Sequence, residues 1–219
     1  RNPVVYAHRY GVDKMRYNML SYASIQHAEN AGDQYQIDGW TMPFYYRDPV
    51  DKRLKTMCLF VVMDAYSKKA VGYYVSGSEN TETILNALED AVRKTGELPF
   101  EIVSDNHSFN QTKVAGNFKE ALERLGVTWT VSSNPRHKQV IERSFRTFGE
   151  CYAKQQYGYT GQGIRSISPD ARISQELFDK YMKAGYLLTE DQIKAIAIYC
   201  VDMWNNGVEN EGKSPNQLY

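Results

Sequence analysis

The chain has 219 residues, and its 26 basic and 26 acidic side chains give a formal net charge of zero. Hydrophobic residues make up 42% of the sequence, which is enough to bury a substantial core and excludes a disordered or collagen-like chain. The longest apolar run, Met57–Met63, is too short to cross a bilayer, so we expect no membrane partner.

The three cysteines are Cys58, Cys151 and Cys200, and none of them forms a Cys-x-x-Cys pair. This spacing disfavours a disulfide framework or a zinc site and favours a reducing cytoplasm. The chain opens with Arg1 rather than Met, and no cationic stretch followed by an apolar run starts it. We therefore expect a soluble, cytoplasmic piece of a longer protein.

The first part of the chain predicts three strands that follow a polar, Tyr-rich stretch. Residues 1–30 form an N-terminal helical or linker segment, with a helix expected over 13–28. The strands are expected at Gln34–Trp40, at the nearly continuous apolar run Thr56–Met63, and at Ala70–Val75. Residues 41–55 contain two prolines and read as a turn, so the three strands predict an antiparallel meander.

Helices and strands then alternate. In chain order we expect a helix that starts at Asn80 or Thr81 and ends at Gly96, a strand at Phe100–Ser104, a helix around Phe118 that closes at Gly126, a strand at Val127–Val131, and a helix over Val140–Tyr157. This order predicts an α/β fold with a mixed five-stranded sheet flanked by helices. The first and fourth strands are expected to be neighbours, and the fourth and fifth to pair in parallel.

The last part of the chain predicts a C-terminal helical appendage. Residues 158–172 contain three glycines and a proline and read as a loop. Ser174 caps one expected helix to about Ala184, and Thr189 with Gln192 forms a capping box for another that ends near Asn206. We therefore divide the chain into 1–30, a core over 31–157, and the appendage over 158–219.

Three acidic residues stand out by their positions on these elements. Asp38 lies in the first strand, Asp105 follows the fourth strand, and Glu142 lies in the first turns of the third helix. Neighbouring first and fourth strands would bring the two aspartates together, and the helix that carries Glu142 could cross nearby. Three such carboxylates repel one another unless a hard divalent cation lies between them, and oxygen ligands favour magnesium or manganese.

Helical spacing separates two faces of this third helix. Ile141, Phe145 and Phe148 form its buried stripe, whereas Lys138, Glu142 and Arg146 lie on another face. Glu142 is thus expected to point outward between two cations.

The sequence resembles the superfamily of retroviral integrases and bacterial DDE transposases, whose catalytic core has an RNase H-like fold. The likeness spans roughly residues 34–157 and rests on the strand around Asp38, the pair Asp105-Asn106, and an Asn-Pro segment that precedes Glu142. Between Asp105 and Glu142 there are 36 residues (142 − 105 − 1 = 36), close to the spacing of that family. Asp64 and Ser67 resemble a family segment whose Asp and Ser are not metal ligands.

Two positions depart from the family pattern. His107 follows Asp105-Asn106 where the family has glycine, and Gln139 stands three residues before Glu142 where it also has glycine. Both changes remove a flexible residue beside the expected site. They affect the expected geometry of the loops rather than the three acids.

A basic cluster accompanies Glu142. Its members, which are candidates for contact with DNA phosphates, are Arg136, His137, Lys138, Arg143 and Arg146. A solvated helix face is the alternative explanation. Asn106 and His107 are candidate auxiliary residues, and His107 could contact a phosphate or carry a proton, although a loop histidine with a structural role is the simpler explanation.

The resemblance implies metal-dependent cleavage and transfer of DNA strands. Asp38, Asp105 and Glu142 would be the catalytic residues and would hold Mg²⁺ or Mn²⁺, as two ions. The implied partners are DNA element ends and target DNA, further copies of the chain assembled on DNA, and an accessory ATPase. The implied location is the bacterial cytoplasm, with the nucleoid as the place of action.

Two alternatives remain open. One is an RNase H-like nuclease that cleaves without joining, against which the spacing from Asp105 to Glu142 argues. The other is a DNA-binding module with a decayed site, which the changes at 107 and 139 and the neutral net charge favour. A strand-transfer assay separates them, since the first gives hydrolysis alone and the second gives binding alone.

Overall fold

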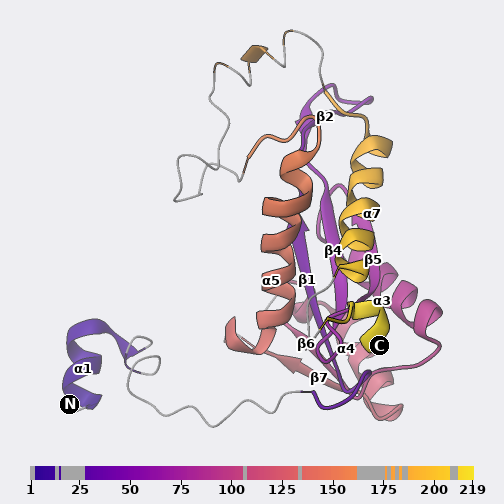
Figure 1. The fold of residues 1–219 in the computed structure, drawn as a ribbon. Coiled ribbons are helices and arrows are strands. Elements are labelled where there is room, and N and C mark those ends of the chain that lie inside the picture. Colours follow the sequence, from indigo (N-terminus) through magenta and orange to yellow (C-terminus); the bar gives the residue numbers. More distant parts are fainter. Residues whose placement is uncertain are drawn as a thin grey trace.

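The computed structural model describes residues 3–12, 15, 28–105, 108–132, 135–161, 176, 179–180, 183, 187–207 and 212–219. Its centre is a mixed sheet of five strands in the order β5-β4-β1-β6-β7 (Figure 1). The strands are β1 (Gln34–Thr41), β4 (Cys58–Asp64), β5 (Ala70–Ser76), β6 (Glu101–Ser104) and β7 (Thr128–Val131).

The pairing of the strands confirms the predicted topology. β1 pairs antiparallel with β4, and β4 pairs antiparallel with β5, as expected for the meander. β1 and β6 are parallel neighbours, and so are β6 and β7. The stretch predicted as a turn between β1 and β4 also contains a small hairpin, β2 (Tyr46–Arg47) and β3 (Leu54–Lys55).

β4 is the central buried strand, and all seven of its residues are buried. Leu59 and Val61 belong to the hydrophobic core on one face of the sheet. Phe60 and Val62 belong to the core on the other face. This alternation explains why the sequence of β4 is continuously apolar, since side chains along a strand point to opposite faces and both faces are covered.

Two helices cover one face of the sheet. α3 (Thr81–Thr95) begins at the N-cap Asn80, whose side chain accepts a hydrogen bond from the backbone N–H of Thr83, and ends at Gly96 in a left-handed conformation. Both ends agree with the prediction. α4 (Lys113–Arg124) follows the short 3₁₀ helix η1 (Ser108–Gln111) and packs on the same face.

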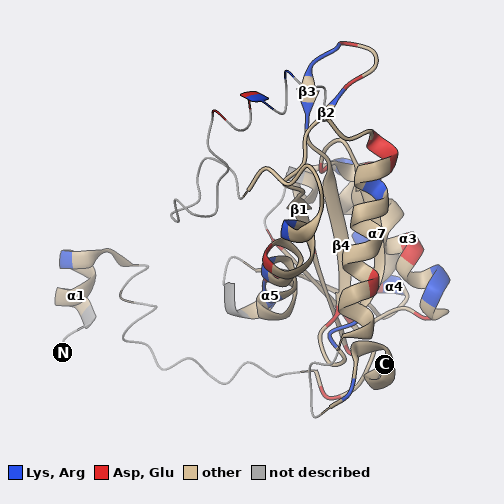
Figure 2. Cartoon of the chain, turned by 45° about the horizontal axis from the view of Figure 1, so that its top comes forward, with Lys and Arg blue, Asp and Glu red and all other residues tan. Residues whose placement is uncertain are grey.

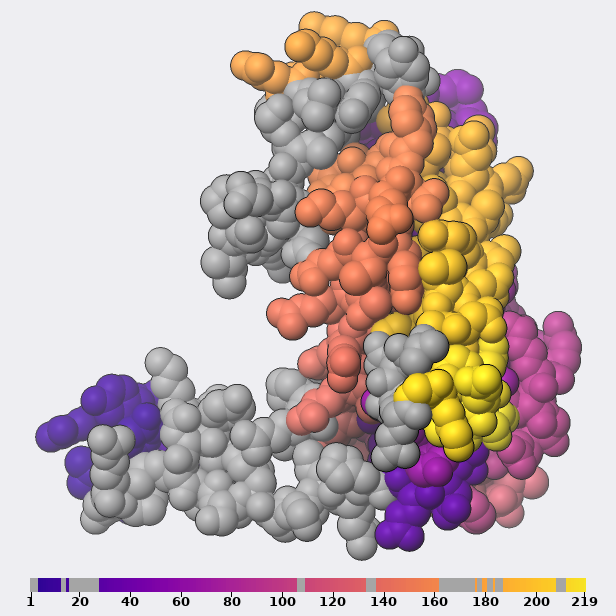
Figure 3. Space-filling model, in the orientation of Figure 1, coloured from indigo at the N-terminus to yellow at the C-terminus, as the bar shows by residue number. Residues whose placement is uncertain are grey.

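The opposite face is covered by α5 and α7. After the 3₁₀ turn η2 (Pro135–Lys138), α5 (Gln139–Thr147) continues through a π-helical turn, η3 (Phe148–Tyr152), and a 3₁₀ turn, η4 (Ala153–Gln155). α7 (Glu190–Asn206) starts with the predicted capping box of Thr189 and Gln192. α5 and α7 run side by side across the face in Figure 3.

α7 does not stand apart from the core. Ile193, Ala197 and Trp204 are buried in the same cluster as Ile141 and Phe148 of the α5 segment. The region treated as a C-terminal appendage therefore contributes its long helix to the main hydrophobic core.

Some expected elements fall on residues that are not described. The helix expected over 13–28 lies mostly outside the described residues, while α1 (Pro3–Tyr10) precedes it. The helix expected from Ser174 to Ala184 also lies mostly outside them. A short helix, α8 (Pro215–Leu218), ends the chain. Among the described segments, no helix is both long enough and apolar enough to span a bilayer.

Candidate active site

Asp38 lies on the face of the sheet that α5 covers. Tyr35 and Ile37 of β1 belong to the core beneath α3 and α4, and alternation along the strand turns Gln36 and Asp38 the other way. The side-chain Oε1 of Gln36 accepts a hydrogen bond from the backbone N–H of Ile141 at 3.3 Å. This contact holds the first turn of α5 close to Asp38.

The parallel register of β1 and β6 places Asp105 beside Asp38. Gln36 pairs with Val103, an offset of 67 residues (103 − 36 = 67), and the same offset relates Asp105 to Asp38 (105 − 38 = 67). β6 ends at Ser104, so Asp105 is the first residue beyond it. The two aspartates that the sequence predicted to be neighbours are therefore brought together.

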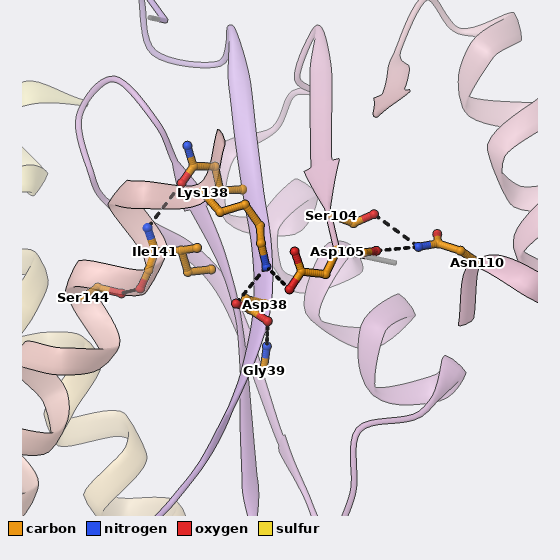
Figure 4. Close-up of polar contacts among 9 residues, drawn as sticks. Asp38, Gly39, Ser104, Asp105, Asn110, Lys138, Ile141 and Ser144 are labelled. Carbon is orange, nitrogen blue, oxygen red and sulfur yellow. Dashed lines mark hydrogen bonds and ion pairs between the residues drawn. The ribbon is translucent and has the colours of Figure 1, made fainter. Parts of the chain in front are cut away.

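The ammonium group of Lys138 lies between the two carboxylates (Figure 4). Its Nζ is 2.9 Å from Oδ2 of Asp38 and 2.8 Å from Oδ2 of Asp105. The side chain of Lys138 is 1% exposed, whereas that of Asp38 is 17% exposed and that of Asp105 is 47% exposed. The lysine is thus buried, and the carboxylate pair opens to solvent on the side of Asp105.

The expectation that Lys138 faces outward with Glu142 is therefore wrong. α5 begins at Gln139, and Lys138 precedes it at the end of η2 with φ −123° and ψ 26°. Because Lys138 is not part of the helix, the four-residue helical spacing to Glu142 does not apply to it. Its side chain turns inward to the aspartates.

Electrostatic effects of opposite sign act on Asp38. Burial raises the pKa of this carboxyl group, and the positive charge and hydrogen bond of Lys138 oppose the increase. The backbone N–H of Gly39 also stabilises the ionised form by donating to Oδ1 at 2.9 Å. The charge of Asp105 raises the pKa of Asp38 further, so ionised Asp38 is stabilised chiefly by the ammonium group of Lys138.

Glu142 lies in the first turn of α5 and is exposed. Burial raises the pKa of its carboxyl group, Lys138 lowers it, and the charges of Asp38 and Asp105 raise it further. Glu142 is thus within electrostatic range of the aspartate pair. Within the described parts of the chain, however, no three His, Cys, Asp or Glu side chains lie close enough together to hold one metal ion.

The chemistry of the aspartate pair fits a divalent cation. Two carboxylate oxygens already converge on a single positive charge, and carboxylate oxygens are the ligands that Mg²⁺ and Mn²⁺ prefer. Asp38 and Asp105 would hold such an ion. The exposed side chain of Glu142 would have to turn toward the pair to join them.

A polar network fixes the chain that leaves β6. Asn110 donates from Nδ2 to the backbone carbonyl of Asp105 at 2.6 Å and accepts at Oδ1 from Nζ of Lys119 at 2.7 Å. Lys119 lies over the ring of Trp129, whose Nε1 donates to Oγ of Ser104 at 3.0 Å. Burial lowers the pKa of Lys119. The network holds the backbone at Asp105 in place.

Sequence reasoning missed Asn110 and Lys119 as residues of this network, and it missed Lys138 as a partner of the aspartates. The available signals were weak. Asn110 is a polar residue that soon follows Asp105, and Lys138 is a cation that immediately precedes the helix of Glu142. Neither signal indicates the direction of a side chain.

The other basic candidates lie around the start of α5. Nδ1 of His137 is 3.0 Å from Oγ of Ser132. Arg143 and Arg146 are exposed on α5. Nε of Arg146 is 3.7 Å from Oε1 of Glu150.

Arg136 belongs to η2, two residues before Lys138. The candidate auxiliary residues Asn106 and His107 lie outside the described residues. Gln139, which replaces the family's glycine, is exposed as the first residue of α5.

Comparison with known proteins supports an integrase-like core. Residues 30–137 match the family described as integrase core domain. The HTLV-2 integrase catalytic core domain in complex with magnesium (dimeric form) is similar in structure, with a TM-score of 0.50 and 15% identity over 86% of this chain and 96% of that one. No curated protein matches the sequence.

A second similar structure is the simian T-cell lymphotropic virus intasome in complex with PP2A regulatory subunit B56 gamma. Its TM-score is 0.51, with 15% identity over 99% of this chain and 67% of that one. At this identity the likeness concerns the fold, which is the RNase H-like arrangement of a mixed five-stranded sheet with helices on both faces. The match over residues 30–137 and the shared fold thus agree with the resemblance to the superfamily of DDE integrases and transposases.

Proposed function

We propose that this chain is the catalytic core of a DNA transposase or integrase, which uses Mg²⁺ or Mn²⁺ to cleave and join DNA strands. The observation that carries the proposal is the convergence of Asp38 and Asp105 on one positive charge, at 2.9 and 2.8 Å. Asp38 lies in β1, and Asp105 immediately follows β6, the neighbouring parallel strand, within the residues that match the integrase core domain.

Each acid has a distinct role in this proposal. Asp38 and Asp105 would hold one ion at the centre of the sheet, and Glu142 would complete a second site from α5. Bound there, two divalent ions would supply the positive charge that activates the attacking hydroxyl and stabilises the leaving oxygen of a phosphodiester. Hydrolysis of one strand leaves a 3′-hydroxyl. This hydroxyl then attacks a phosphate of the target DNA, and the bond from that phosphorus to the 3′-oxygen of the target strand breaks. Because no covalent bond to the protein forms, no Ser or Tyr nucleophile is required.

Two exposed arginines support binding of DNA beside these acids. Arg143 and Arg146 follow Glu142 along α5, so both signs of charge occur on this helix (Figure 2). We propose that they contact phosphates of the bound DNA, as cations beside a catalytic site commonly do. Arg136, His137, Asn106 and His107 remain further candidates for such contacts.

The similar structures suggest the form of the assembly. One is an integrase core in a dimeric form, and the other is an intasome. We propose that the present chain also works as an oligomer on paired DNA ends, within a larger protein. An accessory ATPase that directs target choice is part of the same proposal.

A strand-transfer assay tests the function. The full protein that contains this chain is incubated with Mn²⁺, a supercoiled plasmid and a pool of short duplexes whose 3′-hydroxyl ends are randomised in sequence, and joined products are sequenced. We expect joined products, at a level that falls at least about a hundredfold in Asp105→Asn and in Glu142→Gln, because metal catalysis supplies several kcal/mol to the transition state.

Glu120→Gln is the matched control, since it removes one carboxylate from the exposed surface of α4. It should leave joining unchanged. Metal-dependent hydrolysis without joined products would instead identify a nuclease of the same fold. DNA binding without any metal-dependent cleavage would identify a binding module with a decayed site.

A further inference from the structure

The position of Lys138 has consequences for how a metal reaches the aspartates. A buried ammonium group is costly unless it is paired, and Lys138 is 1% exposed with a carboxylate on each side. The carboxylates of Asp38 and Asp105 are in turn stabilised by the cation between them, because two adjacent carboxylates repel each other. The lysine and the two acids therefore form a mutually stabilised set without any further ion.

The contacts of Lys138 use the oxygens that a shared metal ion would need. Nζ approaches Oδ2 of both aspartates. Oδ1 of Asp38 is engaged by the backbone N–H of Gly39 at 2.9 Å. A cation held by both side chains in their present rotamers would therefore meet the ammonium group at Oδ2 of Asp38 (Figure 4).

We propose that Lys138 is an internal counter-ion that competes with the divalent metal for Asp38 and Asp105. This inference rests on the proposed function, because it assumes that the pair holds a metal. The ammonium group and the metal exclude each other through shared ligand oxygens and through the repulsion of like charges. Metal binding then requires the side chain of Lys138 to leave the pair.

The backbone around Lys138 is compatible with such a movement. Lys138 stands at the junction between η2 and α5, and its side chain makes no hydrogen bond that caps α5. Its displacement would leave the contact between Gln36 and Ile141, which fixes the first turn of α5, intact. The aspartates can therefore exchange one cation for another without unfolding the helix that carries Glu142.

Metal affinity and thermal stability test this role in the chain without DNA. Mn²⁺ binding is measured by electron paramagnetic resonance for the wild type, Lys138→Gln and Arg146→Gln. We expect Lys138→Gln to bind Mn²⁺ about ten- to a hundredfold more tightly, the range that corresponds to one charge-assisted hydrogen bond. Arg146→Gln removes an exposed cation from α5 and should change the affinity much less.

Thermal unfolding supplies an independent readout. Lys138→Gln should lower the melting temperature without metal, and saturating Mn²⁺ should restore most of the loss, because the metal replaces the missing charge. An unchanged or weaker Mn²⁺ affinity in folded Lys138→Gln would overturn the inference. So would a loss of stability that Mn²⁺ does not restore, since Lys138 would then have a purely structural role.

The double variant Asp38→Asn/Lys138→Gln separates this inference from the proposed function. Loss of the enhanced binding in the double variant locates the metal on the aspartate pair. If the wild type, Lys138→Gln and the double variant all fail to bind Mn²⁺, the metal-dependent function fails together with the inference. If the wild type binds at Asp38 and Lys138→Gln binds equally well, only the role of Lys138 fails.

Discussion

Three aspartates near the ends of the central strands have different surroundings. Asp64, at the end of β4, is fully buried, and its carboxylate accepts hydrogen bonds from Gly32 N at 2.9 Å, Ser67 N at 2.7 Å and Ser67 Oγ at 2.6 Å. Asp38 and Asp105 instead meet at a single cation and are partly open to solvent. The donors around Asp64 organise the turn after β4 and leave it poorly placed to bind a metal.

We expect substitutions of Asp64 and Asp38 to separate stability from metal binding. Asp64→Asn should cost about 1–3 kcal/mol of unfolding free energy, because the new amide nitrogen faces hydrogen-bond donors. It should retain Mn²⁺ binding, whereas Asp38→Asn should lose it. Urea unfolding measures the first effect and Mn²⁺ titration the second. Loss of metal binding in folded Asp64→Asn would contradict this assignment.

At the scale of elements, a close approach between β5 and α3 fixes one face of the sheet. A Cβ placed on Gly72 of β5 would lie 2.5 Å from the backbone nitrogen of Ala91 and 2.6 Å from the carbonyl oxygen of Ala87. Both are backbone atoms of α3 and cannot move aside as a side chain would. Glycine at 72 is therefore required by the packing of the helix onto the strand.

Gly72→Ala should destabilise the protein by about 1–3 kcal/mol or more, as overpacking of a tight contact does. Gly116→Ala is the matched control, because a Cβ at that position in α4 meets nothing within 4 Å. It should stabilise the helix by about 0.5–1 kcal/mol. Chemical denaturation of both variants measures the difference, and equal effects would show that the contact of Gly72 is unimportant.

At the scale of the whole molecule, α7 ties the C-terminal region to the edge of the sheet. Nε1 of Trp204 donates to the backbone carbonyl of Lys68 at 2.6 Å. The side chain of Asn205 accepts from the backbone N–H of Ala70 at 2.9 Å and donates to its carbonyl at 3.0 Å. These contacts supply hydrogen-bond partners to backbone groups at the start of β5, which is an edge strand of the sheet. They therefore limit the pairing of this edge with other chains.

Trp204→Ala should cost about 3–5 kcal/mol of unfolding free energy, because it removes a large buried side chain. Met203→Ala, one residue earlier and 41% exposed, should cost less than about 1 kcal/mol. When the unfolding of the sheet core is monitored in urea, Trp204→Ala should show a single transition at a lower urea concentration. A separate early transition with an unshifted main one would instead indicate that α7 is an independent appendage.

The sequence by itself determined those features that depend on local periodicity and capping. The apolar run of β4 predicted a strand buried on both faces, Asn80 and Gly96 bounded α3, and Thr189 bounded α7. The order of strands and helices also predicted that β1 and β6 are neighbours, which brings Asp38 and Asp105 together.

Only the tertiary structure decided where the charged side chains around these acids point. The inward turn of Lys138 depends on its position just before α5, which begins at Gln139, and on two carboxylates that are distant in the sequence. The burial of Trp204 likewise depends on a sheet edge formed by distant residues. Periodicity describes a single element, whereas the pairing of buried charges and the covering of an edge depend on contacts between elements, which the sequence pattern does not contain.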